Sequence, residues 1–126
     1  MNRLIWIAAA ICTSLPASAQ VVDPACFGVV PGTIAIRPSA PTNTEPIAVA
    51  VAAANFLGQS TVAQINGNVI DVTMTGVSFG LQPPPFCGVV IVGPLTSGNY
   101  QVSYYLIRDG GAAQLQATLA FTVADI

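Results

Sequence analysis

Stretches in which every second residue is apolar recur along this chain, and they limit its possible folds more than any other feature. In "NVIDVTMTG" (residues 68–76), Ile70, Val72 and Met74 fall on one side of an extended chain. The residues between them are polar, and a period of two is typical of a β-strand with one buried face and one wet face. The chain is therefore expected to consist of β-strands.

Six further stretches have a similar character and are separated by turns rich in Gly, Pro and Asn. They are "TIAIRP" (33–38), "EPIAVAVAA" (45–53), "STVAQI" (60–65), "GVVIV" (88–92), "NYQVSYYLI" (99–107) and "AQLQATLAFTV" (113–123). "GVVIV" is apolar throughout, which predicts a strand covered on both sides. The last two stretches are each expected to place one apolar set on a single face: Tyr100, Val102, Tyr104 and Leu106, then Leu115, Ala117, Leu119, Phe121 and Val123.

The connection "RDGG" (108–111) holds the only adjacent pair of opposite charges, Arg108 and Asp109. A tight hairpin turn needs positive φ at both of its central residues. Asp followed by Gly favours such a turn, because this pair adopts positive φ more readily than most residues. The pair is therefore expected in water at a hairpin tip rather than in a chemical site. A second turn, "NGN" (66–68), is expected to join its two flanking strands by the same chemistry.

About seven short strands and no helical stretch in residues 20–126 predict an all-β fold. The expected architecture is two antiparallel sheets packed face to face as a sandwich. A closed β-barrel is the competing arrangement.

The stretch "GPLTSGNYQVSYYL" (93–106) favours the sandwich. It resembles the start of the penultimate strand in immunoglobulin-like (Ig-like) domains of secreted bacterial proteins, where a tyrosine caps the corner between the sheets. "PTNTEPIAVAV" (41–51) looks like the approach to an early strand of such domains, and the resemblance covers most of residues 33–123. The only tryptophan, Trp6, lies outside that range, so the core tryptophan of antibody-type domains is missing. The resemblance to this poorly characterised type implies a fold and no specific activity.

The first 19 residues are predicted to be a cleaved secretory signal peptide. A cationic start with Arg3 precedes an apolar run from Leu4 to Cys12, and small residues at Ala17 and Ala19 stand before Gln20. A membrane anchor is the alternative, but the run is about half of the ~20 residues needed to cross a bilayer. A lipid anchor on Cys12 is a second alternative, although lipoprotein signals have Gly, Ala or Ser directly before the cysteine and this chain has Ile11 there. The expected location is secreted or periplasmic.

Residues 20–126 are expected to form a single domain, with residues 20–32 as an N-terminal arm. They contain two arginines, five acidic residues and neither lysine nor histidine. Nucleic-acid binding needs clustered cations, and so does binding to an anionic membrane. Neither partner is expected, and neither is membrane insertion after signal cleavage.

Cys26 and Cys87 are the two cysteines that remain after cleavage, and an even count in an exported protein predicts a disulfide. The bridge is expected to tie the arm "VVDPACFGVVPG" (21–32) to the loop before residue 88. A metal site is a weaker interpretation, because two thiolates without histidine fall short of four ligands. A redox pair usually has the two cysteines close in sequence, which these are not.

Catalytic, cofactor-binding and metal residues are not expected. Without histidine the commonest general base is absent, together with Ser-His and Cys-His nucleophiles. The five acids are scattered, and Asp71, the one acid within a predicted strand, reads as a lone surface carboxylate.

Three functions remain, and the first is preferred. It is a non-catalytic module that contacts another protein or a surface structure; the second is sugar binding on an outward-facing Tyr105. The third is a subunit of a surface fibre assembled by strand exchange, through the uncharged run "LQATLAFTV" (115–123). In "GLQPPPFCG" (80–88), three prolines favour an extended, rigid crossover, and Phe86 is either a plug or a contact residue.

Overall fold

Seven β-strands make up the described part of the chain, which comprises residues 26–80 and 85–126 of this computed structural model. They are β1 (Ile34–Arg37), β2 (Ile47–Ala53), β3 (Phe56–Asn66), β4 (Val69–Ser78), β5 (Phe86–Val92), β6 (Gly98–Arg108) and β7 (Gln114–Val123). Each overlaps a stretch expected from the sequence, although β3 begins four residues before the predicted stretch 60–65 and β5 two residues before 88–92. The predicted signal peptide and residues 81–84 of the proline loop lie outside the described residues. Among the described residues, no helix has the length and apolar character to cross a membrane.

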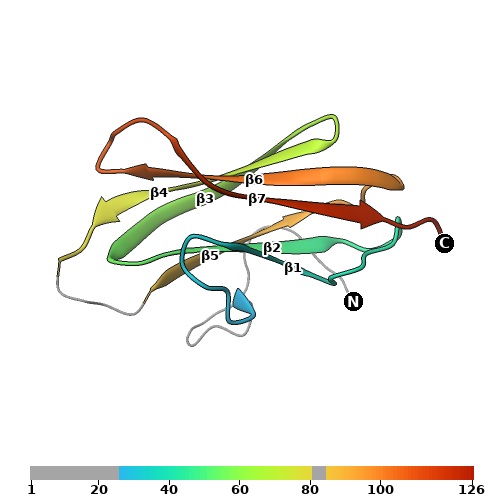
Figure 1. The fold of residues 1–126 in the computed structure, drawn as a ribbon, viewed down its shortest axis with the longest axis horizontal. Coiled ribbons are helices and arrows are strands. Elements are labelled where there is room, and N and C mark those ends of the chain that lie inside the picture. Colours follow the sequence, from blue (N-terminus) through green and yellow to red (C-terminus); the bar gives the residue numbers. More distant parts are fainter. Residues whose placement is uncertain (1–25, 81–84) are drawn as a thin grey trace.

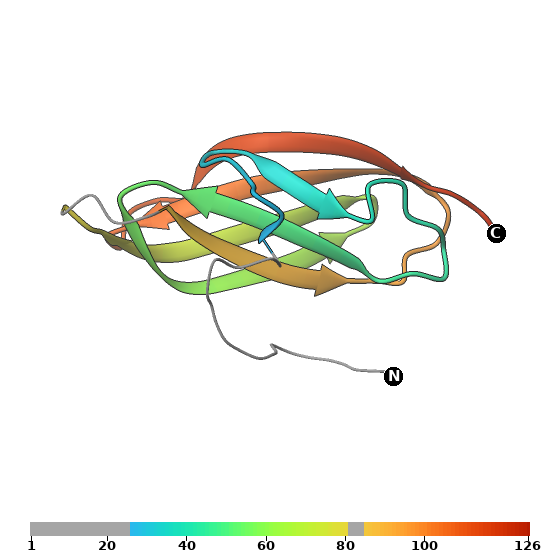
Figure 2. The same ribbon diagram turned by 90° about the horizontal axis from the view of Figure 1, so that it is seen from below.

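The strands form two sheets that lie one over the other (Figure 1). One sheet has three strands in the order β1-β2-β5, and the other has four in the order β3-β4-β6-β7. Strands of both sheets run along the long axis of the molecule (Figure 2). The expectation of an all-β fold with two sheets is confirmed.

The expectation that both sheets are antiparallel is wrong at one pair, because β4 and β6 run parallel. The β3–β4 hairpin joins the sheet through β4, which leaves β3 at the edge. The reason lies in the inward faces of the two strands. On β4 this face carries Ile70, Val72 and Met74, all fully buried, whereas the residues of β3 that pair with them are Ile65, Ala63 and Thr61, which are less apolar or smaller in two of the three pairs. Burying the more apolar strand in the middle of the sheet is the more favourable arrangement.

The core lies between the sheets and is built from the expected alternating faces. Ile47, Val49 and Val51 enter from β2, and every second residue of β6 from Tyr100 to Leu106 enters from the other side. Tyr104 crosses the core, and its hydroxyl donates a hydrogen bond to the Ala52 carbonyl oxygen at 2.9 Å. The hydroxyl of Tyr100 donates to the Thr96 carbonyl oxygen, 2.8 Å away, where the chain passes from β5 to β6.

Two other expectations about strand faces are wrong. The β5 strand is not covered on both sides, because it is an edge strand and its Ile91 is 65% exposed. On β7, Leu115 does not share the inward face with Phe121 and Val123. A bulge in the β6–β7 pairing between Tyr104 and Tyr105 shifts the alternation, so Leu115 pairs with outward-facing Tyr105.

The described part of the N-terminal arm lies over part of the outer face of the three-stranded sheet, around β2 (Figure 2). Ala50 and Ala52 alternate with the inward valines of β2 and yet are fully buried. Alanine leaves room for the backbone of the arm to approach, and the Gly32 amide donates a hydrogen bond to the Ala52 carbonyl oxygen at 2.9 Å. Phe27 of the arm lies under the Arg37 guanidinium, 4.9 Å from the ring centre. No comparable segment among the described residues lies over the four-stranded sheet (Figure 1).

Candidate functional site

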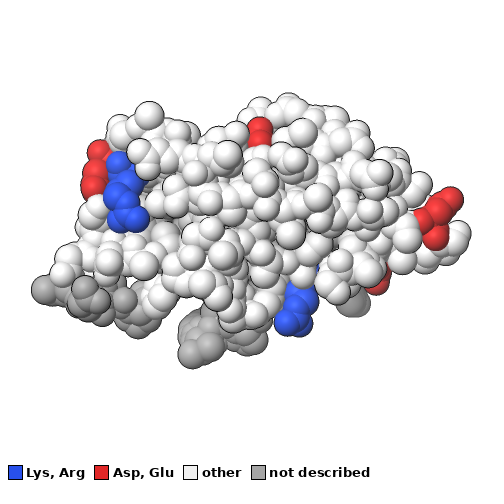
Figure 3. Space-filling view, viewed as in Figure 1, with Lys and Arg blue, Asp and Glu red and all other residues white. Residues whose placement is uncertain are grey.

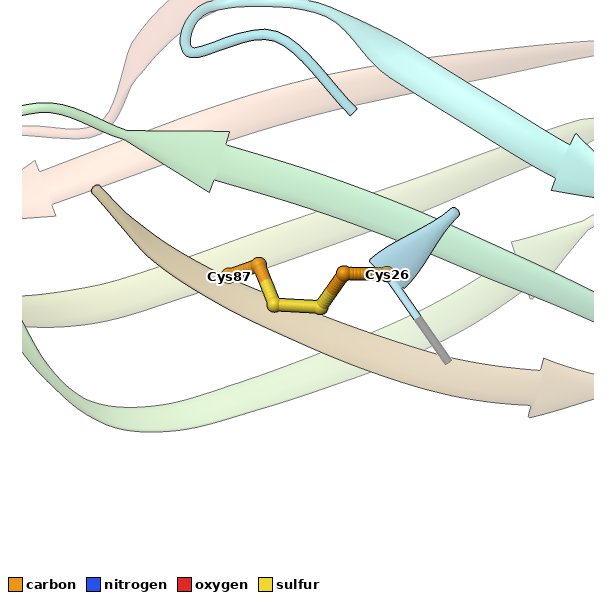
Figure 4. The surroundings of a disulfide bond; sticks show 2 residues. All are labelled: Cys26 and Cys87. Carbon is orange, nitrogen blue, oxygen red and sulfur yellow. A yellow bond between two sulfur atoms is a disulfide. The ribbon is translucent and has the colours of Figure 1, made fainter. Parts of the chain in front are cut away.

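The two predicted bridging cysteines are joined in the structure. Cys26 stands at the start of the described arm and Cys87 on the outer face of β5, with their Cα atoms 6.3 Å apart (Figure 4). Cys26 is buried and Cys87 half-buried. The bridge spans 61 residues of sequence and fastens the arm to the three-stranded sheet.

Phe86, the first predicted contact residue, packs into the structure. Its ring meets Phe56 edge-on, with 6.4 Å between the ring centres. It also lies directly against the backbone of Gly58, where an added Cβ would collide with the ring. Phe86 therefore fills the gap between the β5 and β3 edges, which is the plug role of the two weighed for it.

Tyr105, the second predicted contact residue, lies on the outer face of the four-stranded sheet. Its sequence neighbours Tyr104 and Leu106 are buried in the core, whereas Tyr105 is half-buried and points the other way. Strand register places one residue from each strand side by side in a row that we call the outer row: Val62, Thr73, Tyr105 and Leu115. The row is uncharged, combines aromatic, aliphatic and hydroxyl groups, and ends in two well-exposed apolar side chains.

On the face shown in Figure 3, charged side chains are few and lie mainly toward the ends and margins of the molecule. On the outer face of the four-stranded sheet, Asp71 stands two positions along β4 from Thr73 and pairs with Ser103. The described residues contain no group of three or more His, Cys, Asp or Glu side chains placed to hold a metal ion.

The Arg108–Asp109 pair lies at the expected hairpin turn, where Asp109 is exposed, and both side chains also bond to neighbouring connections. The predicted turn is present, since Asp109 and Gly110 both have positive φ and the Gly111 amide donates to the Arg108 carbonyl. The Asp109 carboxylate, however, accepts hydrogen bonds from the Ser78 amide at 2.9 Å and the Ser78 hydroxyl at 2.7 Å. These bonds, with a smaller contribution from the charge of Arg108, lower the pKa of Asp109.

The Arg108 guanidinium connects the same hairpin to the β2–β3 turn. It donates to the Asn55 carbonyl oxygen at 3.1 Å and lies 5.0 Å from the centre of the Phe56 ring. Three connections are thereby held together at one end of the sandwich. Neither Ser78 nor Asn55 could be singled out from the sequence, because each is at least 30 positions away from Arg108 and is brought to it only by strand pairing.

The residues considered for function thus separate into two groups. Cys26, Cys87, Phe86, Arg108 and Asp109 hold the fold together, whereas Tyr105 lies on a surface that the rest of the described chain leaves open. Comparison with known proteins found no matching family model, no similar curated protein and no similar solved structure.

Proposed function

We propose that this chain is an exported, non-catalytic Ig-like module that contacts a protein or a cell-surface component through the outer face of its four-stranded sheet. The observation that carries the proposal is the contrast between the two outer faces. The arm is fastened over one by a disulfide, whereas the other presents the outer row around Tyr105.

Two features support the Ig-like assignment. The order β1-β2-β5 matches strands A, B and E of Ig domains, and β6 and β7 then take the places of F and G. The Tyr100–Thr96 hydrogen bond has the geometry of the tyrosine corner of such domains, where a tyrosine near the start of strand F bonds backbone a few residues upstream. The chain departs from the pattern at β4, which lies parallel beside β6 where strand C would be expected.

Export is supported by the signal-like N-terminus and by the Cys26–Cys87 bridge, since disulfides persist in oxidising compartments. The non-catalytic character is inferred from composition, because the chain has no histidine and its acids are scattered.

The outer row is well suited to contact with an uncharged surface. Tyrosine offers a large rigid contact area at low entropic cost, and charged residues are depleted at the centre of protein interfaces. Thr73 lies directly beside Tyr105 in the adjacent strand and supplies a hydroxyl at the same level. Sugar binding would use the same tyrosine as a stacking platform, so the two functions are separated by experiment.

Site-specific photo-crosslinking in the exporting cell tests the proposal. A photoreactive phenylalanine analogue at position 105 should give a discrete adduct with another macromolecule. The same analogue at Thr44, exposed on the β1–β2 loop and outside the outer row, is the matched control. Equal labelling at both positions, or none at position 105, would contradict a contact surface there. Tyr105-dependent binding on a glycan array would support the sugar function instead.

A further inference from the structure

The β3 strand has an unusually unprotected free edge. It is 11 residues long, "FLGQSTVAQIN", with no charge and no proline, and it forms the border of the four-stranded sheet. Edge strands normally carry lysine, proline or a strong twist, because unpaired N–H and C=O groups invite another strand. The only protective feature along β3 is a bulge between Gly58 and Ser60.

The two halves of β3 differ in what surrounds them. The first half is backed by β5, since Phe86 lies against Gly58 and the Thr61 side chain lies against Gly88. Beyond Thr61 the apolar side chains are open on both faces: Val62, on the outer face, is 57% exposed. Ile65 pairs with fully buried Ile70 on the inward side and is still 45% exposed. The segment 62–66 therefore lacks a neighbour at its edge and cover on its inward face.

The other edge of the same sheet is partly occupied. Just after β7, Ala124 donates its amide hydrogen to Pro41 and accepts one from Asn43, at 3.0 and 2.9 Å. The segment around Thr42 thus pairs in parallel beside the end of β7. Of the two edges, only β3 has no such bridge among the described residues.

We propose that two copies of this chain pair through β3, antiparallel and across a two-fold axis, to form one continuous eight-stranded sheet. A second copy fits because the edge is uncharged, so identical strands meet without repulsion. With Ala63 opposite its counterpart, Val62 faces Gln64 and Thr61 faces Ile65, each pair on one face of the sheet. Pairing around this axis reduces the exposure of Val62 and Ile65 in each copy.

Pairing of β3 with β7 of another copy is the less favourable geometry. Both strands run opposite to β4 and β6, so a translated copy would place them in parallel. Parallel pairing is slightly less stable per residue, and a head-to-tail contact leads to open filaments rather than a closed dimer.

Sedimentation equilibrium of the disulfide-bonded protein, residues 20–126, tests the proposal. The unmodified protein should sediment as a dimer. Val62→Lys and Gln64→Lys should each shift it to monomer, because they place like charges close together across the axis. Gln64→Lys removes no apolar side chain and so keeps the test valid if Val62→Lys lowers stability.

Leu115→Lys is the matched control, because Leu115 is 55% exposed against 57% for Val62 but lies on β7. It should remain dimeric. A protein that stays monomeric at concentrations up to ~1 mM, which corresponds to weak binding, would overturn the proposal. The β3 edge would then be available to a strand from another protein. Dissociation by Leu115→Lys with no effect of Gln64→Lys would also overturn it. The proposed contact face is probed separately at Tyr105, on an interior strand, so either idea can fail alone.

Discussion

The Tyr104 hydroxyl donates a hydrogen bond to the carbonyl oxygen of Ala52 and so connects the two sheets through the core. The same carbonyl oxygen accepts a second hydrogen bond from the Gly32 amide of the arm. One backbone atom of β2 therefore joins the four-stranded sheet, the three-stranded sheet and the arm.

Burial raises the pKa of Tyr104 to about 12, against an ordinary value of 10.0. Because the unfolded chain ionises first, the stabilising contribution of this residue is complete below pH ~10 and is lost as the pH rises toward ~12. Denaturant unfolding at pH 9 to 12 should show stability falling with pH. Tyr104→Phe should weaken that dependence and lower stability at neutral pH by about 1 kcal/mol. An unchanged pH slope in this variant would show that Tyr104 is not the responsible group.

Removal of the Cys26–Cys87 bridge should lower stability substantially, because the bridge closes a long loop in the unfolded chain. The chain-entropy relation gives about 4 kcal/mol for a loop of this length. Cys87→Ser should therefore lower the thermal midpoint by roughly ten degrees or more. Thiol titration of the unfolded protein without reductant should find no free thiol. Two free thiols in protein isolated without reductant, or a disulfide-linked dimer, would contradict an intramolecular bridge.

Arg108→Ala should destabilise the fold more than Asp109→Asn. The arginine loses its contact with the buried Phe56 ring and its hydrogen bond to Asn55, for about 1 kcal/mol in total. Asparagine at 109 tolerates positive φ and keeps an acceptor for the Ser78 amide. Arg108→Lys keeps the charge but removes the planar group that stacks on the ring. If this variant loses about as much stability as Arg108→Ala, the effect comes from stacking rather than from charge.

Acidification tests Asp109 directly. Its pKa is lowered in the folded state, so its contribution is present above pH ~4 and is lost as the pH falls through the folded value. Thermal midpoints measured from pH 2 to 7 should fall less in Asp109→Asn than in the unmodified protein. Parallel curves for the two proteins would mean that the Ser78 contacts do not depend on the carboxylate charge.

The strands and their inward faces could be predicted because they follow from local alternation, as for Ile70, Val72 and Met74 on β4. The Asp109–Gly110 turn could be predicted because few residues adopt positive φ. The parallel β4–β6 pair, by contrast, depends on how a hairpin docks as a unit, which no local pattern records. The bulge beside Tyr105 likewise shifts Leu115 to the outer face through one unpaired residue, and Arg108 meets Asn55 only once the sheets are assembled.

The contact between Gly58 and Phe86 should be the most sensitive point along the β3–β5 gap. A Cβ at position 58 would overlap the Phe86 ring, so Gly58→Ala should force the ring outward and uncover the edge of Phe56. Overpacking of this kind destabilises by about 1–3 kcal/mol. Gly80→Ala, where an added Cβ meets nothing within 4 Å, is the control and should be close to neutral.

A double-mutant cycle with Phe86→Ala separates this collision from a general loss of glycine flexibility. Once the ring is removed, Gly58→Ala should have a much smaller effect, giving a coupling of about 1 kcal/mol or more between the two positions. Strictly additive effects in denaturant unfolding would mean that Phe86 does not occupy the space above Gly58. Another residue of β5 would then have to fill the gap between β3 and β5.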